Sequence, residues 1–302
     1  MRRFWPLILF LIIFLIAFFG FNKVPSVENP SPIAPQRIIT LAPNITEIAF
    51  ALGLDKEVVA VTKYCDYPEK ACKLPHVGGF IDPNLEAIVA LQPDLVILVA
   101  SQRQTIAQLQ QLNIPTLAVK NASLLDIRTS IADIASATHH QQQAEQLLAE
   151  IEQQISIITQ KVSGLHRPSV MISMGHSSGS EQVKSVYIAG QHDFYNELIQ
   201  LAGGKNSYQS KHLKVPSLSI EGIMQLNPDV IIDIFPEASD HNADIDQVKQ
   251  QWQNLHHVNA IKNNRIHIIE ENYATIPGPR IFRLLDTMAA LIHPELEWDT
   301  TL

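Results

Sequence analysis

Two cysteines, Cys65 and Cys72, are the only thiols in this chain of 302 residues, and six residues separate them. Metal-binding and redox cysteine pairs are usually closer, as in a CxxC motif, so this spacing does not favour a metal pair or a redox pair. In an oxidising compartment the pair would close a short loop as a disulfide and stabilise the fold by about 2–3 kcal/mol. We therefore expect a Cys65–Cys72 disulfide if the chain is exported.

Twelve histidines offer imidazole as a metal ligand. His176 follows a predicted strand in the second half of the chain, where it could face a cleft and ligate cobalt or iron; a hydrogen-bonded surface histidine is the commoner outcome. The adjacent pairs His139-His140 and His256-His257 do not favour a metal site, because neighbours on a helix do not share a face. We expect no metal site of the protein's own and no cofactor.

Three common enzyme motifs are absent from the sequence: GxxxxGK[ST], GxGxxG after a strand, and HExxH. The segment LAGGKN at 201–206 is similar to a phosphate loop, but it follows a predicted helix where such a loop follows a strand. We expect a protein that is not an enzyme, with a scattered catalytic site as the open alternative.

The elements that must position these residues follow an α/β pattern. From Arg37 onward, short β-branched runs alternate with amphipathic segments, which indicates α/β units around mainly parallel sheets. The predicted strands are 37–41, 58–62, 94–100 and 115–119, then 169–175, 229–235 and 265–270. Between the two series, apolar residues from Ala144 to Val162 recur at spacings of three, four and seven, which is typical of one stripe of a long helix.

An internal repeat indicates two lobes of similar plan. Leu85–Ile97 (LEAIVALQPDLVI) and Ile220–Ile232 (IEGIMQLNPDVII) share six of thirteen residues at an offset of 135. Each copy predicts a helix, a Pro-Asp turn and a buried strand. We predict two Rossmann-like lobes over 37–138 and 164–295, joined by a single backbone helix over 139–163. A ligand cleft would lie between the lobes, where strand ends and loops converge.

The first 23 residues have the pattern of an export segment. Arg2 and Arg3 precede an uncharged, mostly apolar run, Phe4–Phe21, which fits a signal peptide or a transmembrane helix. The run is longer than a usual signal core and no small-x-small site follows it, so cleavage and retention as an anchor both stay open. A Pro-rich linker follows over 24–36. We expect a periplasmic protein, either soluble or anchored to the inner membrane.

The net charge limits the partners. It is −8 at pH 7, and loss of Arg2, Arg3 and Lys23 with the first segment would lower it to −11. A surface this acidic argues against nucleic acid and anionic lipid as main partners. The 46% hydrophobic content is enough for a substantial core.

Several segments of the chain, through their order and spacing, carry a resemblance to a known protein family. They are LAPNITEIAFALG at 41–53, the two repeat copies, LAGGKN at 201–206, RIHII at 265–269 and PGPR at 277–280. Over residues 35–295 the chain resembles the periplasmic binding proteins that serve cobalamin and ferric-siderophore importers, and it is closest to the cobalamin-binding member. The resemblance implies the solute-binding component of an ABC importer. We expect a monomer whose protein partners are a permease and its ATPase.

Some of the matching residues also have a local structural role. Asn44 and Glu47 have the spacing of a capping box at the start of a helix, and Gly53 can take the left-handed conformation that ends it. Gly203 and Gly204 are expected to end a helix in the same way.

Glu86 and Glu221 occupy equivalent positions in the two repeat copies, each near the start of its helix. An acid there stabilises the helix N-terminus by about 0.3–1 kcal/mol. By resemblance, each is the exposed glutamate at a lobe tip that meets arginines of the permease. The two roles are compatible, and we expect both residues to dock the protein.

The resemblance also suggests the ligand. In the cobalamin-binding member, aromatic residues at the places of Tyr64 and Phe80 line the cleft, and aromatic rings suit the broad apolar face of a corrinoid. Tyr273, before the last helix, is a third candidate, with packing in the core as the alternative for Phe80 and Tyr273. The chain departs from that member at Val215 and Ile276, where an aromatic residue and an arginine would be expected. We expect a cobalamin as the ligand.

Other ligands and other roles stay open. A ferric siderophore, haem or another metal chelate would suit the same architecture. So would free zinc or manganese, although such a site needs several histidines and carboxylates that converge in the cleft. The fold could also serve an anchored interaction or sensor protein that does not transport.

Overall fold

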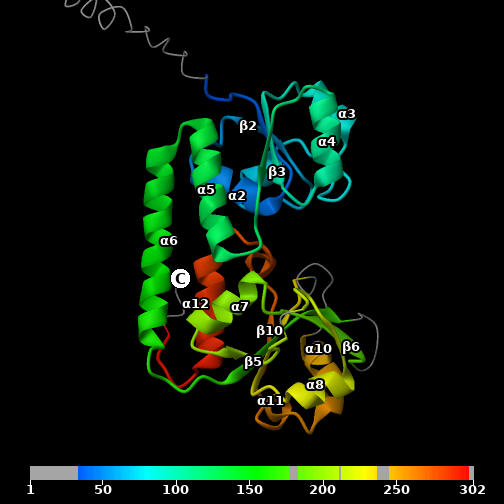
Figure 1. The fold of residues 1–302 in the computed structure, drawn as a ribbon, viewed down its shortest axis with the longest axis vertical. Helices are drawn as coiled ribbons and strands as arrows, with labels where there is room; N and C mark the ends of the chain where they lie inside the picture. The colour runs from blue at the N-terminus through cyan, green and yellow to red at the C-terminus, as the bar shows by residue number, and fades with distance from the viewer. Residues whose placement is uncertain (1–32, 177–182, 211, 237–244, 299–302) are drawn as a thin grey trace, which may run out of the picture. The chain divides into compact units, whose positions relative to one another are not determined.

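The first lobe contains a parallel sheet of four strands in the order β2-β1-β3-β4. Figure 1 labels β2 and β3 of this sheet. The computed structural model describes residues 33–176, 183–210, 212–236 and 245–298. All five residues of β3 are apolar and buried, as expected of a parallel strand covered on both faces. The strands are β1 (Ile38–Thr40), β2 (Val58–Val61), β3 (Leu95–Val99) and β4 (Thr116–Val119), and the helices are α2 (Pro43–Ala51), α3 (Leu85–Ala90), α4 (Arg103–Gln111) and α5 (Leu124–Thr138), with the short helix η1 (Ala71–Lys73).

The second lobe contains a mixed sheet in the order β10-β9-β5-β6-β8, and β7 also pairs with β5. Strands β10, β9 and β5 are parallel, whereas β6 is antiparallel to both of its neighbours. The strands are β5 (Ser169–His176), β6 (Ser185–Ile188), β7 (Lys205–Asn206), β8 (Ser217–Ser219), β9 (Val230–Ile234) and β10 (Ile266–Ile269). The helices are α7 (Phe194–Leu201), α8 (Ile220–Leu226), α10 (Ile245–Gln251), η2 (Trp252–Leu255), α11 (Asn259–Lys262), η3 (Asn272–Thr275) and α12 (Ile281–Ile292).

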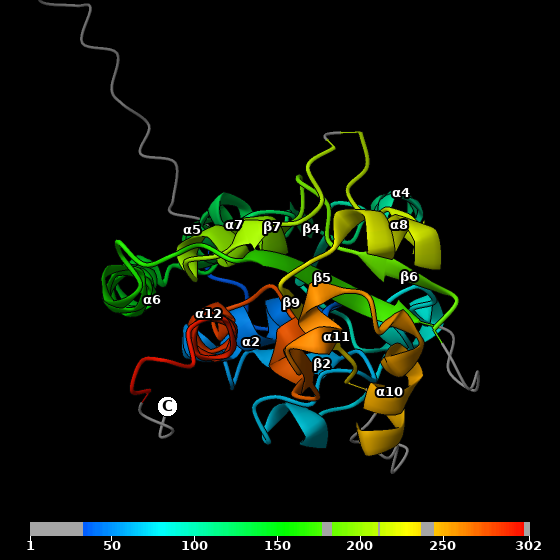
Figure 2. The same cartoon turned by 90° about the horizontal axis from the view of Figure 1, so that it is seen from below.

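A long helix, α6 (Gln141–Lys161), follows the first lobe. Its buried residues Ala144, Ile151 and Ile158 recur every seven positions and form the apolar stripe predicted from the sequence. The helix packs against α5 and α12, and α6 and α12 lie next to each other in Figure 2. The predicted α/β fold with parallel sheets and two lobes is therefore confirmed.

The apolar core is continuous between the lobes. One cluster of buried side chains includes Ile45 on α2, Ile151 on α6, Leu285 on α12 and Ile232 on β9. The far faces of the two sheets have separate, smaller clusters. Residues Pro35–Leu302 accordingly form one unit.

The predicted capping box at Asn44 and Glu47 is wrong. The N-cap of α2 is Ala42, which makes no side-chain cap, and Pro43 begins the helix. Asn44 thus lies inside the first turn, and the carboxylate of Glu47 binds Arg280 instead of the helix N-terminus. The prediction for Gly53 is confirmed, since it follows α2 with φ +85°.

Of the two glycines expected to end α7, only Gly203 takes the left-handed conformation, with φ +79°. Gly204 has a different reason to be small. A Cβ atom there would lie 2.8 Å from the Val170 side chain and 3.1 Å from that of Ile199. Gly204 therefore allows close packing of the chain after α7 against β5.

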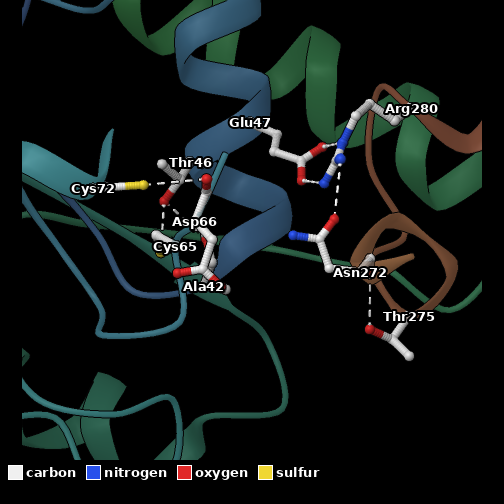
Figure 3. A network of polar contacts seen from close by, with 9 residues as sticks. All are labelled: Ala42, Thr46, Glu47, Cys65, Asp66, Cys72, Asn272, Thr275 and Arg280. Atoms are coloured by element: carbon white, nitrogen blue, oxygen red, sulfur yellow. Dashed lines mark hydrogen bonds and ion pairs between the residues drawn. The ribbon is translucent and has the colours of Figure 1, made fainter. Parts of the chain in front are cut away.

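The predicted Cys65–Cys72 disulfide is absent, and both thiols are free. Cys65 is buried, and its sulfur is hydrogen-bonded to the hydroxyls of Thr46 and Thr62, each at 3.1 Å. The exposed Cys72 donates its thiol to the Asp66 carbonyl at 3.2 Å, as Figure 3 shows. Each sulfur is thus held by its own partners, and burial raises the pKa of the Cys65 thiol.

The predicted export segment, 1–23, and nearly all of the linker, 24–36, lie outside the described residues. Within the described ranges, we find no helix with the length and apolar character needed to span a membrane.

Candidate functional site

The carboxyl ends of the strands of the first lobe bring the Tyr64 and Phe80 segments together. Tyr64 lies in the loop after β2, and the preceding residue, Lys63, donates its backbone N–H to the Gly78 carbonyl at 3.0 Å. Gln102, just after β3, donates its side-chain amide to the Phe80 carbonyl at 2.7 Å. The loops after β2 and β3 therefore hold the Gly78–Phe80 segment at the edge of the sheet where ligands of α/β folds usually bind.

The two aromatic side chains of this edge differ in exposure. Tyr64 is 54% exposed, and the Lys63 ammonium lies 4.8 Å from the centre of its ring. Phe80 is half-buried and packs against the main apolar cluster. Tyr64 thus offers a ring surface that a ligand could cover, whereas Phe80 contributes partly to the core. Ligand binding by both residues stays a prediction.

In the second lobe, Tyr273 lies in η3, just after β10. It is half-buried, and its hydroxyl is 3.2 Å from that of Thr287 on α12. Tyr195 on α7 donates its hydroxyl to the Ala274 carbonyl at 2.6 Å, which fixes η3 to the rest of this lobe.

His176 ends β5, and its side chain lies outside what the structure describes.

The two positions that depart from the cobalamin-binding pattern are both accessible. Val215 is 44% exposed and precedes β8, and Ile276 is half-buried just after η3.

In the described ranges, no three His, Cys, Asp or Glu side chains are grouped as metal ligands.

A buried ion pair joins the two lobes, and sequence reasoning missed it. Glu47 on α2 faces Arg280 at the start of α12, as Figure 3 shows. The guanidinium donates from Nε to Oε2 at 2.9 Å and from Nη2 to Oε1 at 2.5 Å. The Glu47 side chain is only 2% exposed, and the Arg280 side chain is 10% exposed. The contact is therefore bidentate and almost fully removed from water.

Two more residues complete the surroundings of Arg280. Its Nη1 donates to Asn272 Oδ1 at 3.1 Å, and its guanidinium lies 4.1 Å from the ring centre of Tyr67. The ring centre of Tyr273 is 5.7 Å away. Burial raises the pKa of Glu47, and the hydrogen bond and charge of Arg280 oppose that rise. The PGPR segment was part of the matching pattern, and this was the one available sign that Arg280 has a specific role.

A cavity of about 520 Å³ lies beside this ion pair. Both Glu47 and Arg280 line it, together with Tyr67 of the loop after β2 and Leu147 of α6. Tyr64, Phe80 and Tyr273 are not among its lining residues. The cavity therefore borders the contact between the lobes and is separate from the predicted ligand aromatics.

Glu86 and Glu221 both lie in the first turn of a short helix, and both are exposed. Asn84 caps α3 by accepting from the Ala87 N–H at 3.0 Å. Ser219 caps α8, and its hydroxyl also donates to Glu221 at 2.7 Å, which lowers the pKa of that carboxyl. The docking role of the two glutamates stays a prediction.

Comparison with known proteins agrees with this geometry. Residues 38–273 match the family model described as periplasmic binding protein. The chain is 28% identical over 269 residues to the uncharacterized ABC transporter substrate-binding lipoprotein YvrC of Bacillus subtilis, covering 86% of this chain and 81% of that protein. It is 27% identical over 270 residues to the vitamin B12-binding protein of Yersinia pestis, covering 87% and 90%.

A solved structure shows the same fold. The periplasmic heme-binding protein RhuT from Roseiflexus superposes with a TM-score of 0.74 at 25% identity, covering 86% of this chain and 98% of that one. The relatives are substrate-binding proteins and not enzymes, as the motif analysis predicted. The chain belongs to the periplasmic binding protein family, as a solute-binding protein of an ABC importer.

Proposed function

We propose that this solute-binding protein captures a cobalamin and delivers it to the permease and ATPase of its importer. The observation that carries the proposal is the 54% exposed ring of Tyr64 at the carboxyl edge of the first sheet. A relative with 27% identity over most of both chains is a vitamin B12-binding protein, which supports the same ligand.

The chemistry of the surrounding residues supports a ligand with little charge. A corrinoid has a broad apolar face and amide edges, which suit the ring of Tyr64 and the half-buried Phe80 and Tyr273. Arg280, the buried cation next to Tyr273, already forms a bidentate pair with Glu47. It is therefore engaged and is not offered to an anionic chelate such as a ferric siderophore.

Delivery would use the two lobe tips. Glu86 and Glu221 are exposed on equivalent helices, so each could meet a cation of the permease. The first 23 residues would carry the chain out of the cytoplasm, as a cleaved signal peptide or as an anchor in the inner membrane. We propose that the exported protein works as a monomer.

Calorimetry on residues 24–302 tests the ligand. We expect cyanocobalamin to bind with micromolar or better affinity and to raise the unfolding temperature as its concentration increases, because it binds only the folded state. Cobinamide serves as a second corrinoid, and haem, a ferric siderophore and zinc or manganese are titrated in parallel. Absence of heat and of a thermal shift with both corrinoids, alongside clear binding of one of the others, would contradict the cobalamin assignment.

A further inference from the structure

The Arg280 guanidinium contacts groups on several sides. Three N–H directions go to the two carboxylate oxygens of Glu47 and to Asn272, and its plane lies 4.1 Å from the ring centre of Tyr67. An arginine held in this way is fixed in position, because its planar fork matches the carboxylate and its cationic carbon lies over the Tyr67 ring.

The partners of Arg280 come from both lobes. Glu47 and Tyr67 belong to α2 and to the loop after β2 in the first lobe. Asn272 belongs to η3 in the second lobe, and Arg280 itself immediately precedes α12. The backbone at Gly278 is also close to α2, since a Cβ atom there would lie 3.5 Å from Asn44 Cα.

The segments joined by Arg280 are the ones that carry the proposed ligand aromatics. Tyr67 is in the same loop as Tyr64, three residues further along the chain. Asn272 is adjacent to Tyr273, and the Tyr195 hydroxyl bond to Ala274 fixes η3 to α7. The contacts of Arg280 therefore link the Tyr64 loop of one lobe directly to the Tyr273 segment of the other.

From this geometry we propose that Arg280 is a positioning residue. It sets the relative placement of the two aromatic segments and so controls ligand affinity without contacting the ligand. The effect on affinity rests on the proposed function, whereas the effect on lobe placement does not. Loss of either partner would leave a buried charge without compensation, and the lobes would then separate locally to admit water.

Distance measurements between the lobes test the placement directly. Spin labels are attached at Q110C on α4 and K262C on α11, both exposed, in a C72S full-length chain in detergent micelles. We expect one narrow distance distribution with Arg280 present and a broadened or shifted one in R280M and E47Q. R280K keeps the charge but cannot reproduce the bidentate and stacked contacts, so an intermediate result is expected.

Ligand affinity is measured on the same proteins. We expect the affinity for cyanocobalamin to fall at least about tenfold in R280M, with a smaller fall in E47Q. The matched control is R128M, which removes the exposed ion pair between Arg128 on α5 and Glu152 on α6. This control should change neither the distances nor the affinity, because exposed pairs contribute little.

Circular dichroism and thermal unfolding show which variants are folded, and E47Q replaces R280M if the latter does not fold. An unchanged distance distribution in a folded variant would overturn the proposal. So would a broadened distribution with unchanged affinity, because the two segments would then not need Arg280 for binding. If the unaltered protein binds no corrinoid, the proposed function fails, and the distance data alone decide whether Arg280 holds the lobes.

Discussion

Individual side chains determine what the site can bind, and among Tyr64, Phe80 and Tyr273 the ring of Tyr64 is the most accessible. It is 54% exposed, and the Lys63 ammonium lies 4.8 Å from the centre of its ring. A ligand that covers this ring would gain the free energy of burying aromatic area. The contribution of Tyr64 can therefore be measured without disturbing the core.

We predict that Tyr64→Ala weakens cobalamin binding by about 1–3 kcal/mol in calorimetry, the cost of losing buried aromatic area. Tyr64→Phe should bind nearly as well, because the ring face remains. The control is Tyr187→Ala, which removes another exposed tyrosine, on β6 of the second lobe. A loss in Tyr64→Phe as large as in Tyr64→Ala would instead indicate that the hydroxyl binds the ligand, for example as a ligand to haem iron.

The sequence predicted the residues with local signals and missed those with distant partners. Gly53 ends its helix as predicted, because a left-handed C-terminal turn depends only on neighbouring residues. Glu47 has the spacing of a capping box, and nothing near it in the sequence indicates that its partner lies 233 residues away. The disulfide prediction is also wrong, and the Cys65 sulfur instead contacts the hydroxyls of Thr62, three residues away, and Thr46, 19 residues away.

Among the elements, the short helices α3 and α8 matter most for partner recognition. They begin at equivalent positions of the repeat, and each has a side-chain N-cap, Asn84 or Ser219. Ile88 and Ile223 are buried at equivalent positions and fix the two helices to their lobes. The exposed glutamates are therefore presented by rigid supports.

We predict that Glu86→Ala combined with Glu221→Ala abolishes uptake while ligand affinity stays unchanged, because charges at the rim of an interface act on association with the partner. Transport of labelled cobalamin in cells and calorimetry on the purified protein give the two readouts. Glu145→Ala with Glu150→Ala is a control that removes two exposed acids from α6. Normal uptake in the lobe-tip variant, or a parallel loss of affinity, would remove the docking role.

The elements themselves were predicted where their patterns are long or continuous. The run LVILV of β3 and the seven-residue spacing on α6 are visible in the sequence because burial repeats along each element. Strands β6 and β8 were not predicted, since they have only four and three residues and expose alternate side chains. Such short antiparallel strands depend on pairing with β5 and with each other more than on their own composition.

At the scale of the whole molecule, a histidine in the second sheet should make stability depend on pH. Burial, followed by the charges of Arg265 and Lys249, lowers the pKa of His267 on β10 below its ordinary value. In the unfolded chain the histidine takes up a proton near pH 6.5, whereas in the folded protein it stays neutral to lower pH. The stability that the neutral histidine provides is therefore complete above about pH 6.5 and is lost as the pH falls toward the folded-state pKa.

We predict that acidification from pH 7 lowers the free energy of unfolding less in His267→Gln than in the unaltered protein, because glutamine does not titrate. Urea unfolding at a series of pH values measures this. The difference between the two proteins isolates His267 from the carboxyls that also titrate in this range, such as Glu47 and Asp193, whose pKa values are raised by burial. Parallel pH curves for the two proteins would show that His267 does not control the acid response.

The Glu47–Arg280 pair also has a consequence for the order in which the chain can fold. Glu47 lies 233 residues before Arg280 in the chain, so it reaches the compartment in which an exported protein folds before its partner does. Until Arg280 arrives, the Glu47 carboxylate has no partner and must remain hydrated, so the face of α2 that it occupies cannot be sealed. The first half is therefore expected to stay a partly hydrated intermediate, and its last contact forms only when nearly the whole polypeptide has arrived.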